Sequence, residues 1–258
     1  MKITMLGCGS STGIPFIGCD CALCTSPNPK NKRMRVSILI EINGKNLLVD
    51  TSPDLREQAL RFGIKQIDAV LYTHDHADHT HGIDELRSFN YLTNETIPIY
   101  CDQATADSLA KRFDYALKPK PDYWYRPSLE VHILPEAEVG NQLVENTPIT
   151  YFKQQHGKIQ TLGFRVGNFA YSTDVNMLPG CSLEALKGLD VWIVDCQGYG
   201  KFFSHASLET TLGWVELIKP KQTIFTHMGH EFEYEKLASE LPPGIVPGYD
   251  GLTITLAT

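Results

Sequence analysis

The chain has 258 residues, of which 42% are hydrophobic, so it can bury a core of ordinary size. Its formal net charge is −7 and no stripe of Lys and Arg stands out, which argues against nucleic acid as the main partner. We recognise no signal peptide and no membrane span, and seven Cys in such a chain favour thiols or metal ligands over disulfides. We therefore expect a cytoplasmic enzyme without a membrane partner, folded as a single domain over 1–258.

The sequence contains both short segments typical of β-strands and segments with helical periodicity. Asn43-Gly44 and Gly167-Asn168 predict hairpin turns between neighbouring strands. The predicted strands are 2–6, 36–42, 46–50, 69–73, 97–100, 129–134, 149–154, 162–166, 169–172, 191–195, 222–226 and 252–256. The predicted helices are 53–62, 104–113, 182–187, 207–218 and 233–241, the first with Ser52 at N-cap and Pro53 at N1. Strand pairs come first in each half and helices later, which predicts an α/β sandwich with helices outside two sheets.

The first predicted strand leads into a glycine-rich segment, residues 7–13, with the sequence G-C-G-S-S-T-G. It either offers backbone N–H groups to a substrate phosphate or is a flexible connection; it lacks the Gly-Lys-Ser/Thr of a Walker motif. A Cys-rich loop at about 13–30 follows and places Cys19, Cys21 and Cys24 within six residues. Three thiols so close suit a tetrahedral structural Zn with a fourth ligand from elsewhere. The candidates for that ligand are Cys8, Cys196 and His230.

The segment 73–81 reads T-H-D-H-A-D-H-T-H directly after an apolar run. His74 and His76 are two apart and point the same way in extended chain, while Asp78 and His79 follow once the chain has turned. Imidazole and carboxylate groups suit Zn, Mn or Fe, and they would repel or go unsatisfied if packed together without an ion. The loop therefore predicts the beginnings of two metal positions.

Later apolar runs also finish on potential ligands, namely His156, Asp174 and His227. Because strand ends converge at one edge of a sheet, we expect them to join the His-rich loop. A two-metal centre then takes shape, with a carboxylate between two ions. The sets are His74, His76 and His156 for the first ion, Asp78, His79 and His227 for the second, and Asp174 for the bridge.

The H-x-H-x-D-H motif followed by His, Asp and His at strand ends resembles the metallo-β-lactamase superfamily, which implies a four-layer αββα sandwich. In that superfamily an Asp at the position of Asp50 braces the His loop by hydrogen bonds. The triplet Cys19, Cys21 and Cys24, the later His-x-x-His and the closing G-Y-D-G-L at 248–252 are similar to the PhnP-like phosphodiesterases. This resemblance selects His230 as the fourth ligand of a structural Zn and suggests a homodimer.

His205 precedes a predicted helix and is the candidate general acid for an alkoxide leaving group, although a surface His is the commoner reading of the residues alone. The resemblance implies a catalytic His at this position. Asp195 either orients His205 or a ligand His, or is a turn residue. We therefore expect two divalent catalytic ions, Mn or Zn, with Asp78, Asp174 and His205 as the catalytic side chains.

The expected reaction is hydrolysis of a small cyclic phosphate or nucleotide-like phosphodiester by a hydroxide that two metals share. Two further readings stay open: an RNA 3′-processing endonuclease of the same superfamily, and a non-hydrolytic PqqB-like relative. The acidic charge and the lack of a long basic insertion weigh against the first, and the full set of ligands weighs against the second. β-Lactamase activity is the least expected.

Overall fold

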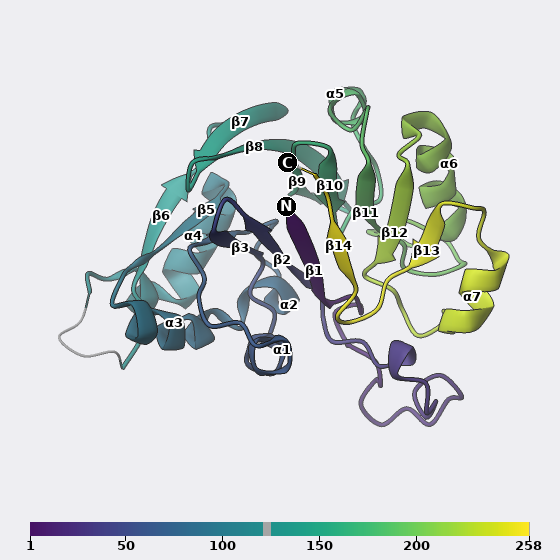
Figure 1. The fold of residues 1–258 in the computed structure, drawn as a ribbon, viewed down its shortest axis with the longest axis horizontal. Coiled ribbons are helices and arrows are strands. Elements are labelled where there is room, and N and C mark those ends of the chain that lie inside the picture. The colour runs from purple at the N-terminus through teal and green to yellow at the C-terminus, as the bar shows by residue number, and fades with distance from the viewer. Residues whose placement is uncertain (121–124, 258) are drawn as a thin grey trace.

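Two seven-stranded sheets pack against each other in the computed structural model, which describes residues 1–120 and 125–257 (Figure 1). The first sheet has the order β14-β1-β2-β3-β4-β5-β6, with β1 (Lys2–Gly7), β2 (Ser37–Ile42), β3 (Lys45–Val49), β4 (Ala69–Leu71), β5 (Ile97–Cys101), β6 (Leu129–Ile133) and β14 (Thr253–Thr255). The second has the order β13-β12-β11-β10-β9-β8-β7, with β7 (Val139–Val144), β8 (Thr147–His156), β9 (Ile159–Val166), β10 (Phe169–Ser172), β11 (Val191–Asp195), β12 (Gln222–Thr226) and β13 (Ile245–Pro247).

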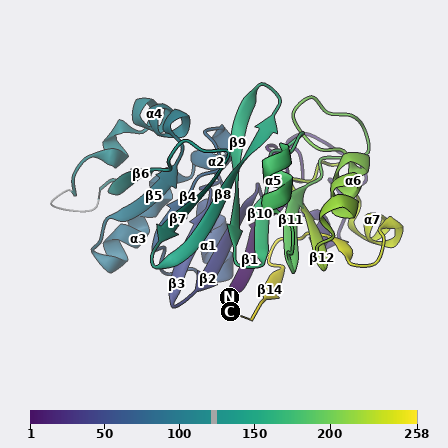
Figure 2. The same ribbon diagram turned by 90° about the horizontal axis from the view of Figure 1, so that it is seen from above.

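Helices cover the outer face of each sheet, as Figures 1 and 2 show. The connections between strands of the first sheet contain α1 (Leu55–Phe62), α2 (Ala77–Thr80), α3 (Leu86–Thr93) and α4 (Gln103–Arg112). The connections between strands of the second sheet contain α5 (Gly180–Ala185), α6 (Leu208–Ile218) and α7 (Tyr234–Glu240). Short 3₁₀ turns lie at Pro29–Asn31, Ile83–Glu85 and Asp114–Leu117. The four-layer αββα sandwich is therefore confirmed, whereas the single domain over 1–258 stays a prediction. None of the described helices is both long and apolar enough to cross a bilayer.

The residues of β1 and β3 alternate between two apolar cores, as strand geometry requires. Met5 and Leu47 belong to the larger core, to which both sheets contribute. Their neighbours Leu6 and Leu48 face the second core, beneath the helices of the first sheet. Both faces of this sheet are thus covered, and its strands are held firmly enough to position side chains at their ends.

Each sheet is part antiparallel and part parallel. Strands β3, β4 and β5 run parallel in one sheet, and β10, β11 and β12 run parallel in the other. Ligands characteristically bind beyond the carboxyl ends of parallel strands, where the loops converge. The loops after β3, β4, β10, β11 and β12 carry the candidate residues, so this arrangement places them in one region.

The first helix begins later than the sequence predicts. It starts at Leu55 with Asp54 at the N-cap, so Ser52 and Pro53 lie outside it. The Ser52 hydroxyl accepts a hydrogen bond from the Asp54 backbone N–H at 3.0 Å and closes a turn before the helix. The Asp54 carboxylate meets Arg35 at 2.6 Å instead of capping the helix. A tertiary ion pair therefore overrides the local capping signal.

Both hairpin turns are confirmed, because Asn43, Gly44 and Gly167 have positive φ between paired strands. The expected strands omit β7 and β13, and the expected helices omit α2 and α3. Strand β7 is a half-exposed edge strand whose pattern shows little apolar alternation. Helix α3 did carry a signal, since Leu86, Phe89 and Asn90 are buried at helical spacing.

Candidate metal centre

The His-rich loop follows β4 and changes conformation between its two pairs of ligands. His76 is still extended, with φ −61° and ψ 154°, and α2 begins at the next residue. His74 and His76 therefore lie on extended chain, while Asp78 and His79 lie on the first turn of α2. The Thr80 hydroxyl donates to the His76 carbonyl at 2.9 Å and holds the two parts together.

The second half of the chain supplies His156 at the end of β8, Asp174 after β10 and His227 after β12. Asp174 and His227 have positive φ values of 52° and 53°, and Asp50, at the end of β3, has 62°. Side chains other than Gly rarely adopt this conformation, and it persists where the surrounding structure imposes it. The backbone is thus bent to aim three polar side chains at one region.

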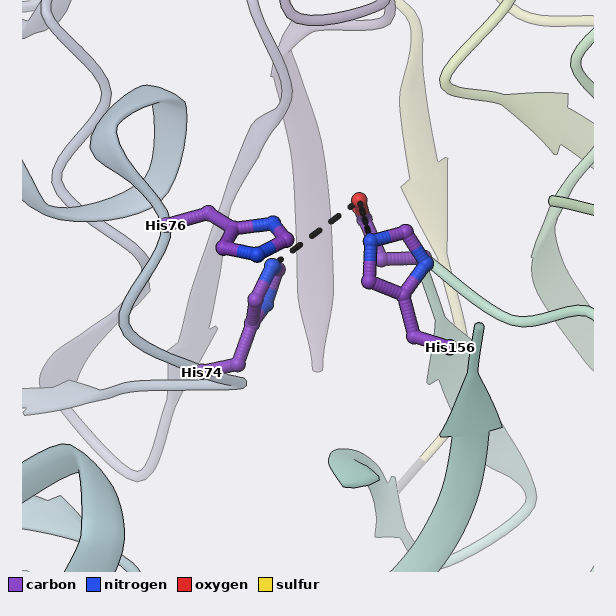
Figure 3. A group of neighbouring side chains, drawn as sticks. His74, His76 and His156 are labelled. Atoms are coloured by element: carbon purple, nitrogen blue, oxygen red, sulfur yellow. Dashed lines mark ion pairs between the residues drawn. The ribbon is translucent and has the colours of Figure 1, made fainter. Parts of the chain in front are cut away.

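Two groups of potential metal donors share Asp174, each with its donor atoms within 4.8 Å of one another. Figure 3 shows His74, His76 and His156 turned toward a common point beside a carboxylate oxygen. That oxygen, Asp174 Oδ1, is 3.9 Å from His74 Nε2 and 3.6 Å from His156 Nε2. The two groups are His74, His76, His156 and Asp174, and Asp78, His79, Asp174 and His227. The structure thus brings together all seven side chains that the sequence assigns to the dinuclear site.

Several histidine rings are fixed through Nδ1, which leaves Nε2 facing inward. His79 Nδ1 meets Asp50 Oδ2 at 2.8 Å, and His156 Nδ1 donates to the Ser204 carbonyl at 2.7 Å. His74 Nδ1 lies 3.0 Å from Thr73 Oγ1, and His227 Nδ1 lies 3.0 Å from Gln197 Oε1. Partners of this kind orient histidine ligands in metal sites. Thr73, Gln197 and Ser204 were not among the predicted site residues, because no local sequence pattern marks them.

Asp50 clamps the loop, as the superfamily resemblance implies. Its carboxylate is fully buried and accepts from the Thr73 backbone N–H and the Thr73 hydroxyl, both at 2.8 Å. It also meets His79 Nδ1, so it reaches both ends of the loop from the adjacent strand β3. Burial raises the pKa of Asp50, and the neighbouring His79 and the Thr73 donors oppose that rise.

The donor set fits divalent metal ions. His74 Nε2, His79 Nε2 and His227 Nε2 are buried and have no hydrogen-bond partner of good geometry among the described residues, although Asp174 oxygens lie 3.1 Å from His79 Nε2 and 3.5 Å from His227 Nε2. Buried polar atoms rarely stay unpaired unless an ion or water completes them. Nitrogen and carboxylate donors of this kind suit Zn or Mn. Three inward-facing nitrogens around one carboxylate therefore meet the requirements of a metal site.

The buried carboxylates of the cluster also favour the binding of cations. Burial lowers the pKa of His74 and His156, which favours the neutral form that binds metal. Burial lowers the pKa of His227 too, but Asp174 and Asp78 outweigh it and raise the value to about 9. Burial alone would raise the pKa of Asp174, yet His227 and His79 hold it well below its usual range. In the metal-free protein these carboxylates thus draw protons onto the rings as their counter-charge.

His205 lies beside the same cluster. Its Nδ1 meets Asp195 Oδ2 at 2.9 Å, and its Nε2 is 4.0 Å from Asp174 Oδ1. The ring stacks on His227 with the centroids 4.4 Å apart, and its side chain keeps 16% of its exposure. Of the readings that the sequence left open for Asp195, the orientation of His205 is the one that this contact supports. The arrangement leaves one ring nitrogen available beside the metal donors.

The Cys-rich loop forms a separate cluster in which Cys19, Cys21 and Cys24 lie close together. Backbone N–H groups point at its sulfur atoms, from Phe16 to Cys24 Sγ at 3.3 Å and from Cys24 to Cys21 Sγ at 3.5 Å. The bond from the Cys24 N–H is the main cause that lowers the pKa of Cys21, as a metal-binding thiolate requires.

None of the three candidates for the fourth ligand belongs to this cluster of thiols. Cys8 is buried and its thiol donates to Asp250, and Cys196 is buried in the larger apolar core. His230 is exposed, and its ring lies 6.2 Å from that of Phe16, whose backbone contacts the cluster. His230 is therefore the candidate that has a neighbour in common with the thiols, and its role as the fourth ligand stays a prediction.

The glycine-rich segment packs against other backbone. The N–H groups of Cys8, Gly9, Ser10 and Gly13 all have acceptors within the protein. A Cβ at Gly7 would lie 2.0 Å from the Arg35 carbonyl oxygen, so this position requires glycine. Close approach of two chain segments explains the glycines better than a phosphate cradle does.

Comparison with known proteins agrees with this fold. The family described as the beta-lactamase superfamily domain matches residues 45–228, and the chain belongs to that family. The fold and donor set are those of a metal-dependent hydrolase. Within the superfamily, the resemblance to the PhnP-like group is confirmed by a crystal structure described as a new diphosphatase from the PhnP family. It is 36% identical with a TM-score of 0.90 and covers 99% of this chain and 98% of that one.

Two other relatives are informative. The protein named octanoyltransferase from Porphyromonas gingivalis is 34% identical over 98% of this chain. The match covers 51% of that relative, so the chain spans about half of its length. The crystal structure of Zn²⁺-bound PqqB from Methylobacterium extorquens has a TM-score of 0.81 at 20% identity, covers 99% of this chain and 100% of that one, and supports the fold alone.

Proposed function

We propose that this chain is a metal-dependent phosphodiesterase for a small cyclic phosphate or nucleotide-like diester. The observation that carries the proposal is the His205 and Asp195 pair beside the donor cluster, with His205 Nε2 4.0 Å from Asp174 Oδ1. A phosphodiester with a sugar alkoxide leaving group needs a proton at that oxygen. A hydrolase whose substrate has a good leaving group needs no such residue.

In this proposal one ion would be held by His74, His76 and His156 and the second by Asp78, His79 and His227, and Asp174 belongs to both groups of donors. Divalent ions there, Mn or Zn, would activate water at neutral pH and neutralise the phosphoryl oxygens. A further Zn would occupy the thiol cluster with His230. The protein's own contribution is orientation: Asp195 fixes the His205 ring through Nδ1, so that Nε2 is the atom that passes a proton to the leaving oxygen.

Replacement of His205 tests this role. We expect His205→Ala to retain its metals and to lose on the order of 10²- to 10⁴-fold in kcat on an alkyl phosphodiester. The loss on a nitrophenyl diester should be much smaller, because nitrophenolate leaves without a proton. Steady-state kinetics on both substrates, with metal analysis of each sample, measure the difference. Equal losses on the two substrates would refute the general-acid role while leaving the hydrolase assignment intact.

A diphosphatase is the second candidate, because the PhnP-family structure with 36% identity is described as one. Its substrate is an anhydride whose leaving group is a phosphate, which depends less on an acid. A panel of cyclic phosphates, nucleotide diesters and nucleoside or sugar diphosphates, assayed with Mn or Zn, separates the two. We expect the highest kcat/KM on a diester, and a consistent preference for diphosphates would overturn the proposal.

An RNA-processing role has less support. It requires a surface that neutralises many phosphates, and the net charge of −7 does not favour one. Small-molecule substrates are the better match to this surface. We also retain the homodimer as a proposal, which sedimentation of the metal-loaded protein tests.

A further inference from the structure

A pocket with several charged side chains in its wall lies between the glycine-rich segment, the Cys-rich loop and α1, with a volume of about 240 Å³. None of the seven dinuclear-site residues lines it, and neither does His205 or a Cys of the thiol cluster. The charged residues in its wall are Lys32, Arg33, Arg35, Arg61, Asp54 and Asp250. It is therefore distinct from the site described above.

The wall of this pocket is cationic in a chain that is acidic overall. Four positive side chains face two carboxylates, while the whole chain has a net charge of −7. Burial raises the pKa of Asp250 to about 6, and backbone N–H groups of Met34 and Cys8 already donate to its carboxylate. The Asp250 carboxylate thus already accepts hydrogen bonds from the backbone, and the net positive charge of the pocket wall is available to bind an anionic ligand.

Two of the arginines have N–H groups without an acceptor among the described residues. Arg33 is 1% exposed; its terminal nitrogens donate to the Gly229 and Phe232 carbonyls, but its Nε has no acceptor among the described residues. The nearest carboxylate oxygen to Arg61 belongs to Asp250, at 3.9 Å, which is too long for a hydrogen bond. Arg35 differs, because Asp54 and the Ser11 carbonyl hold it. Both arginines line the pocket, so its wall contains one residue with a buried unpaired donor and one with a loosely held guanidinium, which together indicate an anion site.

We propose that this pocket binds a phosphate group, either as the free ion or on a small phosphate monoester. Guanidinium groups suit phosphate because they present parallel N–H donors. A pocket of about 240 Å³ is smaller than the roughly 300–1,000 Å³ that drug-sized molecules occupy, so the ligand is small. Through its carbonyl acceptors Gly229 and Phe232, Arg33 connects the pocket to the loop that carries His227 and His230.

Calorimetric titration of the metal-loaded protein tests the proposal, with inorganic phosphate and glycerol phosphate as separate probes at constant ionic strength. Arg61→Gln removes the loosely held guanidinium. Arg56→Gln is the matched control, because Arg56 is exposed on the same helix and outside the pocket. We expect the wild type and Arg56→Gln to bind alike, and Arg61→Gln to bind on the order of tenfold more weakly at one saturable site.

The unfolding temperature without phosphate checks that both variants fold, and its rise on adding phosphate should shrink only in Arg61→Gln. The relative affinity for the two probes shows whether the pocket takes the free ion or a monoester. Phosphate held only at the metal centre would bind Arg61→Gln and the wild type equally. That result, or the absence of saturable binding, would overturn the proposal.

Discussion

At the scale of single residues, the metal centre depends on hydrogen-bond partners that contact the Nδ1 atom of several histidine rings and leave Nε2 facing the donor cluster. The two His proposed for the second ion have different partners: His79 contacts the Asp50 carboxylate, whereas His227 contacts the neutral Gln197 amide. The backbone of Gln197 also joins the His205 loop to the His227 loop, since its backbone N–H donates to the Ala206 carbonyl and its backbone carbonyl accepts from the Gly229 N–H. A carboxylate partner makes a histidine ligand more basic than an amide does.

Replacement of Gln197 should therefore change metal affinity in a direction set by the new side chain. Gln197→Leu removes the acceptor for His227 Nδ1–H, and we expect affinity for the second ion to fall roughly 10- to 100-fold. Gln197→Glu keeps an acceptor and should bind that ion at least as tightly as the wild type. Competition with a chromogenic chelator measures both affinities. A purely structural role for Gln197 would weaken binding in both variants alike.

At the scale of elements, the Cys-rich loop has a very small apolar core of its own. Its buried apolar cluster contains only Ile14, Leu23 and Cys24, with Cys19 and Cys21 packed against it. Such a small core stabilises a long loop poorly, and small units of this kind commonly depend on a metal or disulfides. The free thiols of Cys19, Cys21 and Cys24 can supply a metal site.

We expect Cys21→Ser to release one equivalent of Zn and to lower the unfolding temperature while the catalytic ions remain. Cys181→Ser is the control, because Cys181 is an exposed thiol outside the cluster. Elemental analysis and thermal unfolding of both variants measure the effects. If Cys21→Ser kept the metal content of the wild type, the structural Zn assignment would be wrong. The parallel variant His230→Ala tests the fourth ligand in the same way.

At the scale of the whole molecule, the centre joins the two halves of the sandwich. One half supplies His74, Asp78 and His79, and the other supplies Asp174 and His227. Without metal, the halves carry buried carboxylates against protonated rings, with the pKa of His227 raised to about 9. A group whose pKa is higher in the folded state stabilises the fold below its unfolded value, and that stabilisation is lost as pH rises through the folded value.

The metal-free protein should therefore lose stability between about pH 6.5 and pH 9, on the order of 2–3 kcal/mol. Metal-loaded protein should not show this loss, because ligated rings are neutral and binding strengthens as protons leave. Urea unfolding of chelator-treated and metal-loaded samples at both pH values measures the difference. His227→Gln serves as the control, since its metal-free form should lose less stability over this range. A metal-free wild type that is equally stable at both pH values would contradict the expectation.

The sequence alone determined the ligand types and the layered fold, because both depend on local signals. Metal donors crowd into 73–81, thiols crowd into 19–24, and polar residues follow apolar strands. These features lead to His74, Asp174 and an α/β sandwich without coordinates, and the superfamily resemblance adds the four-layer αββα order. The start of α1 was misplaced, since its N-terminus depends on the contact between Asp54 and Arg35, which lie 19 residues apart.

The tertiary structure alone decided how those donors are aimed. Gln197, Ser204 and Thr73 orient rings in ways that no spacing marks, and the structure selects His205 from the roles that the sequence left open for Asp195. The glycine-rich segment proved to be a site of close chain packing, and the cationic pocket next to it draws Arg33 and Arg61 from separate elements. The physical reason is common to all of them: hydrogen bonds and electrostatic fields act through space, between residues that the chain order keeps apart.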